Sequence, residues 1–71
     1  LSVRYSLPSR DNVKISLFTG FGALIDQKVT GIQNAGGHVH TFDMSEMPAG
    51  TYIVKVSTGS YHEARPINIT K

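Results

Sequence analysis

The most strand-like stretch of this 71-residue chain is Thr51-Tyr52-Ile53-Val54-Lys55-Val56-Ser57-Thr58. Tyr52, Val54 and Val56 line one face of it, which is the period-two pattern of a strand with a buried face. Ile53 adds apolar area to the opposite face. Apolar groups on both faces predict that this strand lies in the middle of a sheet.

Similar alternation predicts further strands on both sides of that stretch. They cover residues 2–7, 13–17, 23–30, 39–44 and 61–70. Predicted turns or loops separate the strands, at residues 8–12, 20–22, 31–37, 45–50 and 58–60. No segment of helical length shows the 3.6-residue period of a helix. Turn signals about every eight to twelve residues predict an all-β fold, a small antiparallel immunoglobulin-like β-sandwich of about six to seven strands. We expect residues 1–71 to form this single domain.

The apolar side chains suggest how the sandwich is filled. Ile67 and Ile69 are two residues apart and share a face, so we expect both to be buried, with Arg65 and Lys71 exposed near the sheet edge. Pro66 has no N–H to donate, so the last strand is predicted to lie at a sheet edge or to carry a bulge. Phe18 interrupts the alternation of its strand and predicts a bulge or a face covered from the other side. The aromatic core is expected to hold Tyr5, Phe18, Phe42 and Tyr52.

The composition excludes several classes of protein. There is no cysteine, so neither a disulfide nor a thiolate metal site stabilises the fold. The net charge is +2 from seven basic and five acidic residues, and no basic tract points to nucleic acid. No apolar run approaches the ~20 residues of a membrane helix. The chain begins at Leu1 rather than Met, and we expect it to be a piece of a longer protein.

Residues 41–56, TFDMSEMPAGTYIVKV, resemble the C-terminal sorting domain of cargo proteins of the type IX (Por) secretion system. In that family a strand ending in Asp-aliphatic-Ser leads into an aliphatic-Pro-x-Gly turn and a strand of the form Gly-x-Tyr-aliphatic-aliphatic-basic-aliphatic. Residues 13–18 look like the family's early strand and residues 58–71 like its terminal hairpin. The turn at residues 19–23 lacks the family's usual Asp and Arg. The immunoglobulin-like domain of the flagellar hook-capping protein is similar in the same features.

The resemblance implies a non-catalytic C-terminal module of a larger exported bacterial protein, a polysaccharide hydrolase or a protease. It implies passage through the periplasm, recognition by outer-membrane secretion machinery, and release or attachment at the cell surface. The last hairpin would offer an edge strand that the machinery extends by strand addition. Lys55, Arg65 and Lys71 would supply basic contacts near that edge. Pro48 and Gly50 are interpreted as structural turn residues, with Gly50 at positive φ.

Two other functions stay open on the residues alone. The domain could be a carbohydrate-binding module attached to a glycoside hydrolase, with Phe21 and Tyr61 stacking on a polysaccharide. It could also be a passive spacer that stabilises a neighbouring domain. An enzyme is not expected, because the chain has no Gly-x-Ser-x-Gly elbow and its glycine pairs are not followed by a helix that could cradle phosphate.

No cofactor and no metal site are predicted. His38 and His40 share a strand face, and His62 is the third histidine. The simpler interpretation is that the first two lie at the exposed beginning of a strand, beside a glycine-rich loop. Asp43 and Glu46 lie near a turn, where an aspartate more often accepts hydrogen bonds from local backbone amides than acts in catalysis.

Overall fold

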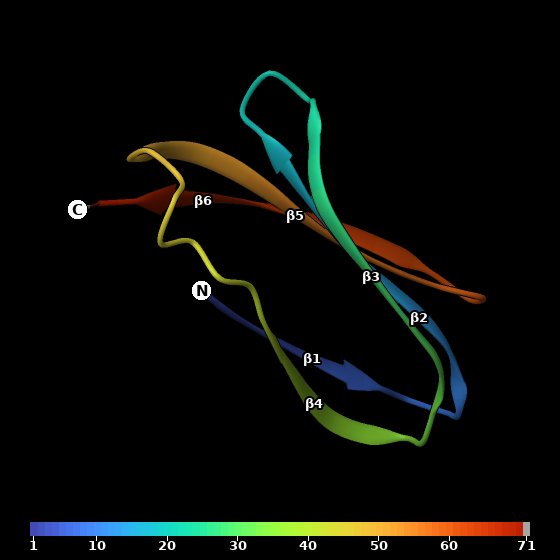
Figure 1. Cartoon of the computed structure of the whole chain (residues 1–71). Helices are drawn as coiled ribbons and strands as arrows, with labels where there is room; N and C mark the ends of the chain where they lie inside the picture. The colour runs from blue at the N-terminus through green and yellow to red at the C-terminus, as the bar shows by residue number, and fades with distance from the viewer. Residues whose placement is uncertain (71) are drawn as a thin grey trace.

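The computed structural model describes residues 1–70, and within that range its regular structure is entirely β. Two strands form one antiparallel sheet in the order β1-β4, and four form a second in the order β3-β2-β5-β6. Figure 1 shows the two sheets as separate layers. The strands are β1 Ser2–Leu7, β2 Asp11–Thr19, β3 Leu24–Gln33, β4 Gly36–Thr41, β5 Gly50–Thr58 and β6 His62–Ile69. The predicted small antiparallel β-sandwich is confirmed, with six strands.

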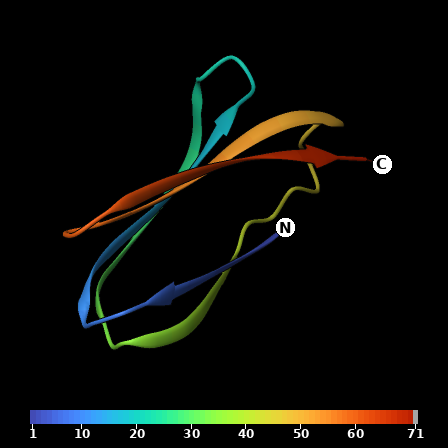
Figure 2. The same cartoon turned by 180° about the vertical axis from the view of Figure 1, so that it is seen from behind.

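The positions of the last two strands agree with the sequence patterns. β5 lies between β2 and β6, so the strand with apolar groups on both faces is a central one. β6 lies at the edge of the larger sheet, where the missing N–H of Pro66 costs least. Leu1 and the end of β6 lie at the same end of the molecule (Figures 1 and 2).

The core lies between the two sheets and follows the period-two pattern. Every second residue of β1, β2 and β5 points inward, as alternation in a pleated strand requires. The most deeply buried side chains are those of Ile15, Leu17 and Val13, all on β2. The complete buried apolar set is Val3, Tyr5, Leu7, Val13, Ile15, Leu17, Phe42, Met44, Tyr52, Val54 and Val56.

The predicted loop at residues 31–37 is wrong. β3 continues to Gln33 and β4 begins at Gly36, so only two residues connect them. Gly31 has a φ of 75° and lies at a register shift between β2 and β3, so this glycine accommodates a bulge within a strand. β4 therefore starts earlier than predicted and ends at Thr41, although Phe42 and Met44 are buried beyond its end.

The core predictions need two corrections, both caused by the layer geometry. Phe18 lies at a register irregularity, as expected, but it is half-buried on the outer face of the larger sheet rather than in the core. Ile67 and Ile69 are half-buried rather than buried. The two-stranded sheet covers only part of the four strands above it, so the inner face of the edge strand β6 is incompletely covered.

Candidate functional site

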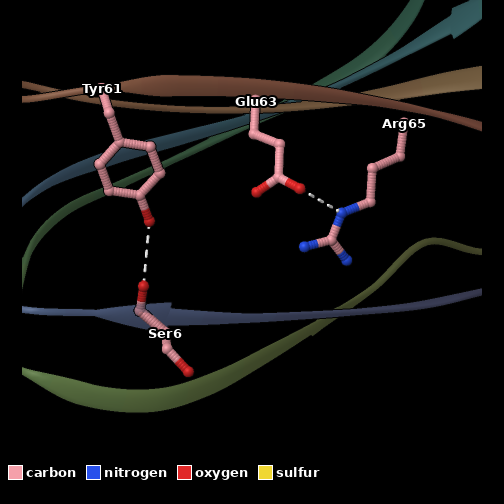
Figure 3. Close-up of polar contacts among 4 residues, drawn as sticks. All are labelled: Ser6, Tyr61, Glu63 and Arg65. Atoms are coloured by element: carbon pink, nitrogen blue, oxygen red, sulfur yellow. Dashed lines mark hydrogen bonds and ion pairs between the residues drawn. The ribbon is translucent and has the colours of Figure 1, made fainter.

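Three alternating side chains at the start of β6 point across the gap between the sheets. Arg65 pairs with Val54, and Glu63 pairs with Val56. Paired residues project to the same face of a sheet, and both valines are buried in the core, so Glu63 and Arg65 face inward. Figure 3 shows Tyr61, Glu63 and Arg65 pointing from the β6 side toward β1.

Two hydrogen bonds organise these side chains. The Tyr61 hydroxyl donates to the carbonyl oxygen of Ser6 on β1 over 3.0 Å. Arg65 Nε donates to Glu63 Oε1 over 2.8 Å. The first bond links the two sheets at their open side, and the second orients the guanidinium group along the gap.

The ion pair shifts the protonation of both partners. The hydrogen bond from Arg65 and its positive charge lower the pKa of Glu63 below its usual value. The same contact raises the pKa of Arg65. The two side chains are 57% and 51% exposed, so solvent screens the pair and it orients the groups more than it stabilises the fold.

A groove of about 510 Å³ lies between these side chains and the smaller sheet. Arg4 and Ser6 of β1 form one wall, and Tyr61, Glu63 and Arg65 form the other. Val56 and parts of β4 complete the lining. Within the groove the charges of Arg65 and Glu63 balance each other. Arg4 alternates with the buried Val3 and Tyr5, so it adds a positive charge at the rim of the groove, on the outer side of β1.

The structure separates the basic residues proposed for recognition. Lys55 pairs with Ala64 and lies on the outer face of the larger sheet, because its neighbours Val54 and Val56 face the core. Arg65 faces the groove on the inner side. Lys71 lies outside the described residues. Lys55 and Arg65 are therefore not one basic patch, and Lys55 is not part of the groove.

The two aromatic residues proposed for sugar stacking are also apart. Phe21 lies in the turn after β2 and its side chain is fully exposed, with a relative exposure of 102%. Tyr61 lies beside the turn after β5, near the beginning of β2. The length of β2 separates them, so they cannot form one stacking platform. Tyr61 is half-buried and its hydroxyl is bonded to Ser6.

The connection before β5 has a defined geometry. The Tyr52 hydroxyl donates to the carbonyl oxygen of Pro48. Gly50 has a φ of 154°, the positive φ expected from the sequence. A second pocket, of about 530 Å³, is lined here by Phe21, Pro48, Ala49 and neighbouring residues. Pro48 and Gly50 thus shape the turn that precedes Tyr52, whose ring is buried in the core.

His38 and His40 lie on the predicted strand but are more covered than the sequence predicted. His38 stacks on Tyr5 with ring centroids 5.4 Å apart, and its Nε2 lies 2.7 Å from the carbonyl oxygen of Asn34. His40 meets the ring of Phe42 edge-on at 4.5 Å. Both lie on one face near the beginning of β4, beside its two glycines, as predicted, but they are half-buried rather than exposed. His62 lies on the outer face of the larger sheet, opposite Ser57.

Carboxylate contacts complete the account of the predicted sites. Asp43 Oδ1 accepts a hydrogen bond from the backbone N–H of Ser45 over 2.9 Å, which is the local contact expected. Within residues 1–70, no three histidine, aspartate or glutamate side chains gather closely enough to hold a metal ion. The same range contains no helix long and apolar enough to cross a membrane.

Sequence reasoning missed Arg4, Ser6 and Glu63 as neighbours of Arg65. The alternation of Tyr61, Glu63 and Arg65 could have placed these three on one face of the last strand. The partner wall could not be found in the same way, because it depends on which strand of the other sheet lies beneath β6.

The chain matches a known family of protein domains. A model of the secretion system C-terminal sorting domain matches residues 1–70. No curated protein and no solved structure matches significantly. Domains of this type are non-catalytic modules that interact with secretion machinery and direct export to the cell surface or the medium. The match spans nearly the whole chain, and the protein belongs to the family of type IX secretion C-terminal sorting domains.

Proposed function

We propose that this domain ends a secreted hydrolase, acting on polysaccharide or on protein, and carries it from the periplasm across the outer membrane. The observation that carries the proposal is the family match over residues 1–70. The module itself performs recognition, and the hydrolytic chemistry belongs to the rest of the parent protein.

The recognition element in this proposal is the terminal hairpin of β5 and β6. β6 pairs with β5 on one side, and within residues 1–70 no strand pairs with its other side. An unpaired edge offers backbone donors and acceptors that a partner strand can use. Arg65 lies on the inner face of this edge strand, and Lys71 follows it in sequence. Lys55 would contribute from the outer face of the hairpin.

The test is export of the full-length parent carrying Arg65→Glu together with Lys71→Glu. We expect the parent to accumulate in the periplasm while the domain stays folded, because Arg65 is an exposed polar position of the edge strand β6 and neither change removes an apolar core residue. The matched control is Lys14→Glu with Lys28→Glu, which makes the same change in charge on β2 and β3. Normal export of the first variant, or equal retention of both, would contradict a recognition role for the hairpin.

Carbohydrate binding remains a second candidate because of one observation, the complete exposure of the Phe21 ring. Exposed aromatic rings are the usual stacking surface for sugars. A sorting module predicts no retention of the isolated domain on cellulose, xylan or chitin. Retention that disappears with Phe21→Ala and with Tyr61→Ala would favour the carbohydrate-binding alternative.

A further inference from the structure

The smaller sheet has an unpaired edge that faces the groove. Within residues 1–70, β1 pairs only with β4, whereas the sheet above has four strands. The Tyr61 hydroxyl reaches the carbonyl oxygen of Ser6 from the β6 side. The free edge of β1 therefore lies at the groove beneath β6. Figure 2 shows β1 running below β6.

The register of the β1-β4 pair identifies which backbone groups this edge presents. Leu1 and Phe42 exchange both backbone hydrogen bonds, at 3.2 and 2.8 Å. In an antiparallel pair, bonded and non-bonded residue pairs alternate. Ser2, Arg4 and Ser6 are therefore in non-bonded pairs, and their N–H and C=O groups point away from β4. The Tyr61 contact at the Ser6 carbonyl agrees with this assignment.

The charges around the edge select the chemistry of an occupant. Arg65 lies inside the groove and Arg4 lies at its rim, on the outer side of β1, while Glu63 is engaged by Arg65. The ion pair uses only the Nε of Arg65. Its two Nη groups remain as donors and lie between β6 and β1 (Figure 3). Planar guanidinium groups bind carboxylates well, so an acidic segment suits this groove.

We propose that the groove binds an extended acidic peptide segment of the secretion machinery, which pairs with β1 as a third strand of the smaller sheet. This proposal rests on the sorting function and names a site for it on β1, distinct from the free edge of β6. The segment forms backbone hydrogen bonds with Arg4 and Ser6. A carboxylate on its inner face meets Arg65, and one on its outer face meets Arg4, because Arg4 alternates with the buried Val3 and Tyr5. A backbone N–H of the segment replaces the Tyr61 hydroxyl at the Ser6 carbonyl.

The test uses a synthetic peptide and backbone hydrogen exchange. The probe is acetyl-Thr-Val-Glu-Glu-Val-Thr-amide, whose adjacent glutamates point to opposite faces of an added strand. Its matched control carries lysine in place of both glutamates. In the free domain the amides of Arg4 and Ser6 should exchange fast, because they lack a strand partner. The acidic peptide at saturation should slow both on the order of tenfold or more, and the lysine peptide should not.

Variants and a modified peptide separate strand pairing from general attraction of charges. Arg4→Glu with Arg65→Glu should weaken binding of the acidic peptide on the order of tenfold or more, which corresponds to about 1.4 kcal/mol per factor of ten. Lys55→Glu, on the outer face, should leave the affinity unchanged. An acidic peptide with N-methylated backbone amides should lose binding, and this test needs no change to the protein.

Three results would overturn the proposal. They are no binding of the acidic peptide at millimolar concentration, binding without protection of Arg4 and Ser6, and equal weakening by Lys55→Glu. Export of the parent is measured separately, so normal export together with any of these results rejects the β1 site and leaves the sorting function standing.

Discussion

The hydroxyl of Tyr52 donates a hydrogen bond to the carbonyl oxygen of Pro48, four residues earlier in the chain. Tyr52 is buried at the start of β5, and Pro48 is exposed in the connection that precedes it. The bond closes this connection against the sandwich, while Gly50 supplies the φ of 154° that turns the chain. The Pro-x-Gly-x-Tyr spacing of the sequence is thus explained by one side-chain contact and one glycine conformation.

Removing this hydroxyl should weaken the fold without changing its shape. Tyr52→Phe keeps the buried ring and loses the bond, so the free energy of unfolding should fall by about 0.5–1.5 kcal/mol. Urea denaturation measures the change. Tyr52→Ala also empties part of the core and should cost about 3–5 kcal/mol. Equal stability of Tyr52→Phe and the unmodified domain would show that the bond does not hold the turn.

Gly50 should be intolerant of a side chain because of its backbone rather than its surroundings. An added Cβ would meet no atom within 4 Å, but the positive φ strains any branched residue. Gly50→Val should therefore cost about 1–3 kcal/mol. Gly37→Val is the control, because Gly37 also has open space around its Cα and does not have positive φ. The same melting temperature for both variants would refute the account of the turn.

The isoleucines of β6 should contribute less than fully buried ones. If they were completely buried, each Ile→Ala change would lower the free energy of unfolding by about 2–5 kcal/mol. Ile67 and Ile69 are half-buried, so we expect about 1–2 kcal/mol each. Ile32→Ala is the control, since Ile32 is 59% exposed and should change stability little. A cost above 3 kcal/mol for Ile67→Ala would mean that β6 is covered more completely than described.

Asp11 should make the stability of the domain depend on pH. Its carboxylate accepts bonds from the Ser60 hydroxyl at 2.8 Å and from the Gly59 amide at 3.1 Å, which ties β2 to the β5-β6 turn. The Ser60 bond, helped by the backbone amides of Asn12 and Gly59, lowers the pKa of Asp11 below its ordinary 3.8. A lowered folded pKa gives stability that is complete above pH 3.8 and is lost as the pH falls further.

The measurement is thermal unfolding of the unmodified domain and of Asp11→Ala at several pH values. Asp11→Ala should melt at a lower temperature than the unmodified domain at neutral pH. The difference between the two melting temperatures should disappear well below pH 3.8. Ser60→Ala removes the largest contribution and should reproduce part of the effect. A difference in melting temperature that stays constant from neutral to acidic pH would show that the ionised Asp11 carboxylate does not cause the stabilisation.

The sequence was sufficient for the number and order of the strands and for much of the core. It was insufficient for the bounds of β3 and β4 and for the contacts between the two sheets. The alternation of Tyr52, Val54 and Val56 is local, so it predicted a buried strand face directly. The half-burial of Ile67 could not be predicted, because it depends on how far the two-stranded sheet extends beneath β6. His38 and His40 were misplaced for a similar reason. Their position at the beginning of a strand beside a glycine-rich loop suggested exposure, but their rings pack on Tyr5 and Phe42.

The candidate site shows the same division. The sequence identified Arg65 and Lys55 as basic residues of the terminal hairpin. Strand alternation divides the residues of one strand between two faces, but it does not say which face of β5 matches which face of β6. Which of them shares a face with the groove depends on the β5-β6 register, in which Arg65 pairs with Val54. Arg4 is distant in sequence from Arg65, and only the packing of β1 beneath β6 brings both to one groove.

The central claim is that this domain directs export. The most direct measurement fuses residues 1–71 to the C-terminus of a periplasmic reporter in a bacterium with a type IX secretion system, and follows the reporter in the periplasm, at the cell surface and in the medium. The account predicts that the reporter leaves the periplasm, and that deleting the domain from its own parent traps the parent there. A reporter that stays in the periplasm, with secretion of the parent intact after deletion, would contradict the account and favour a spacer or sugar-binding role.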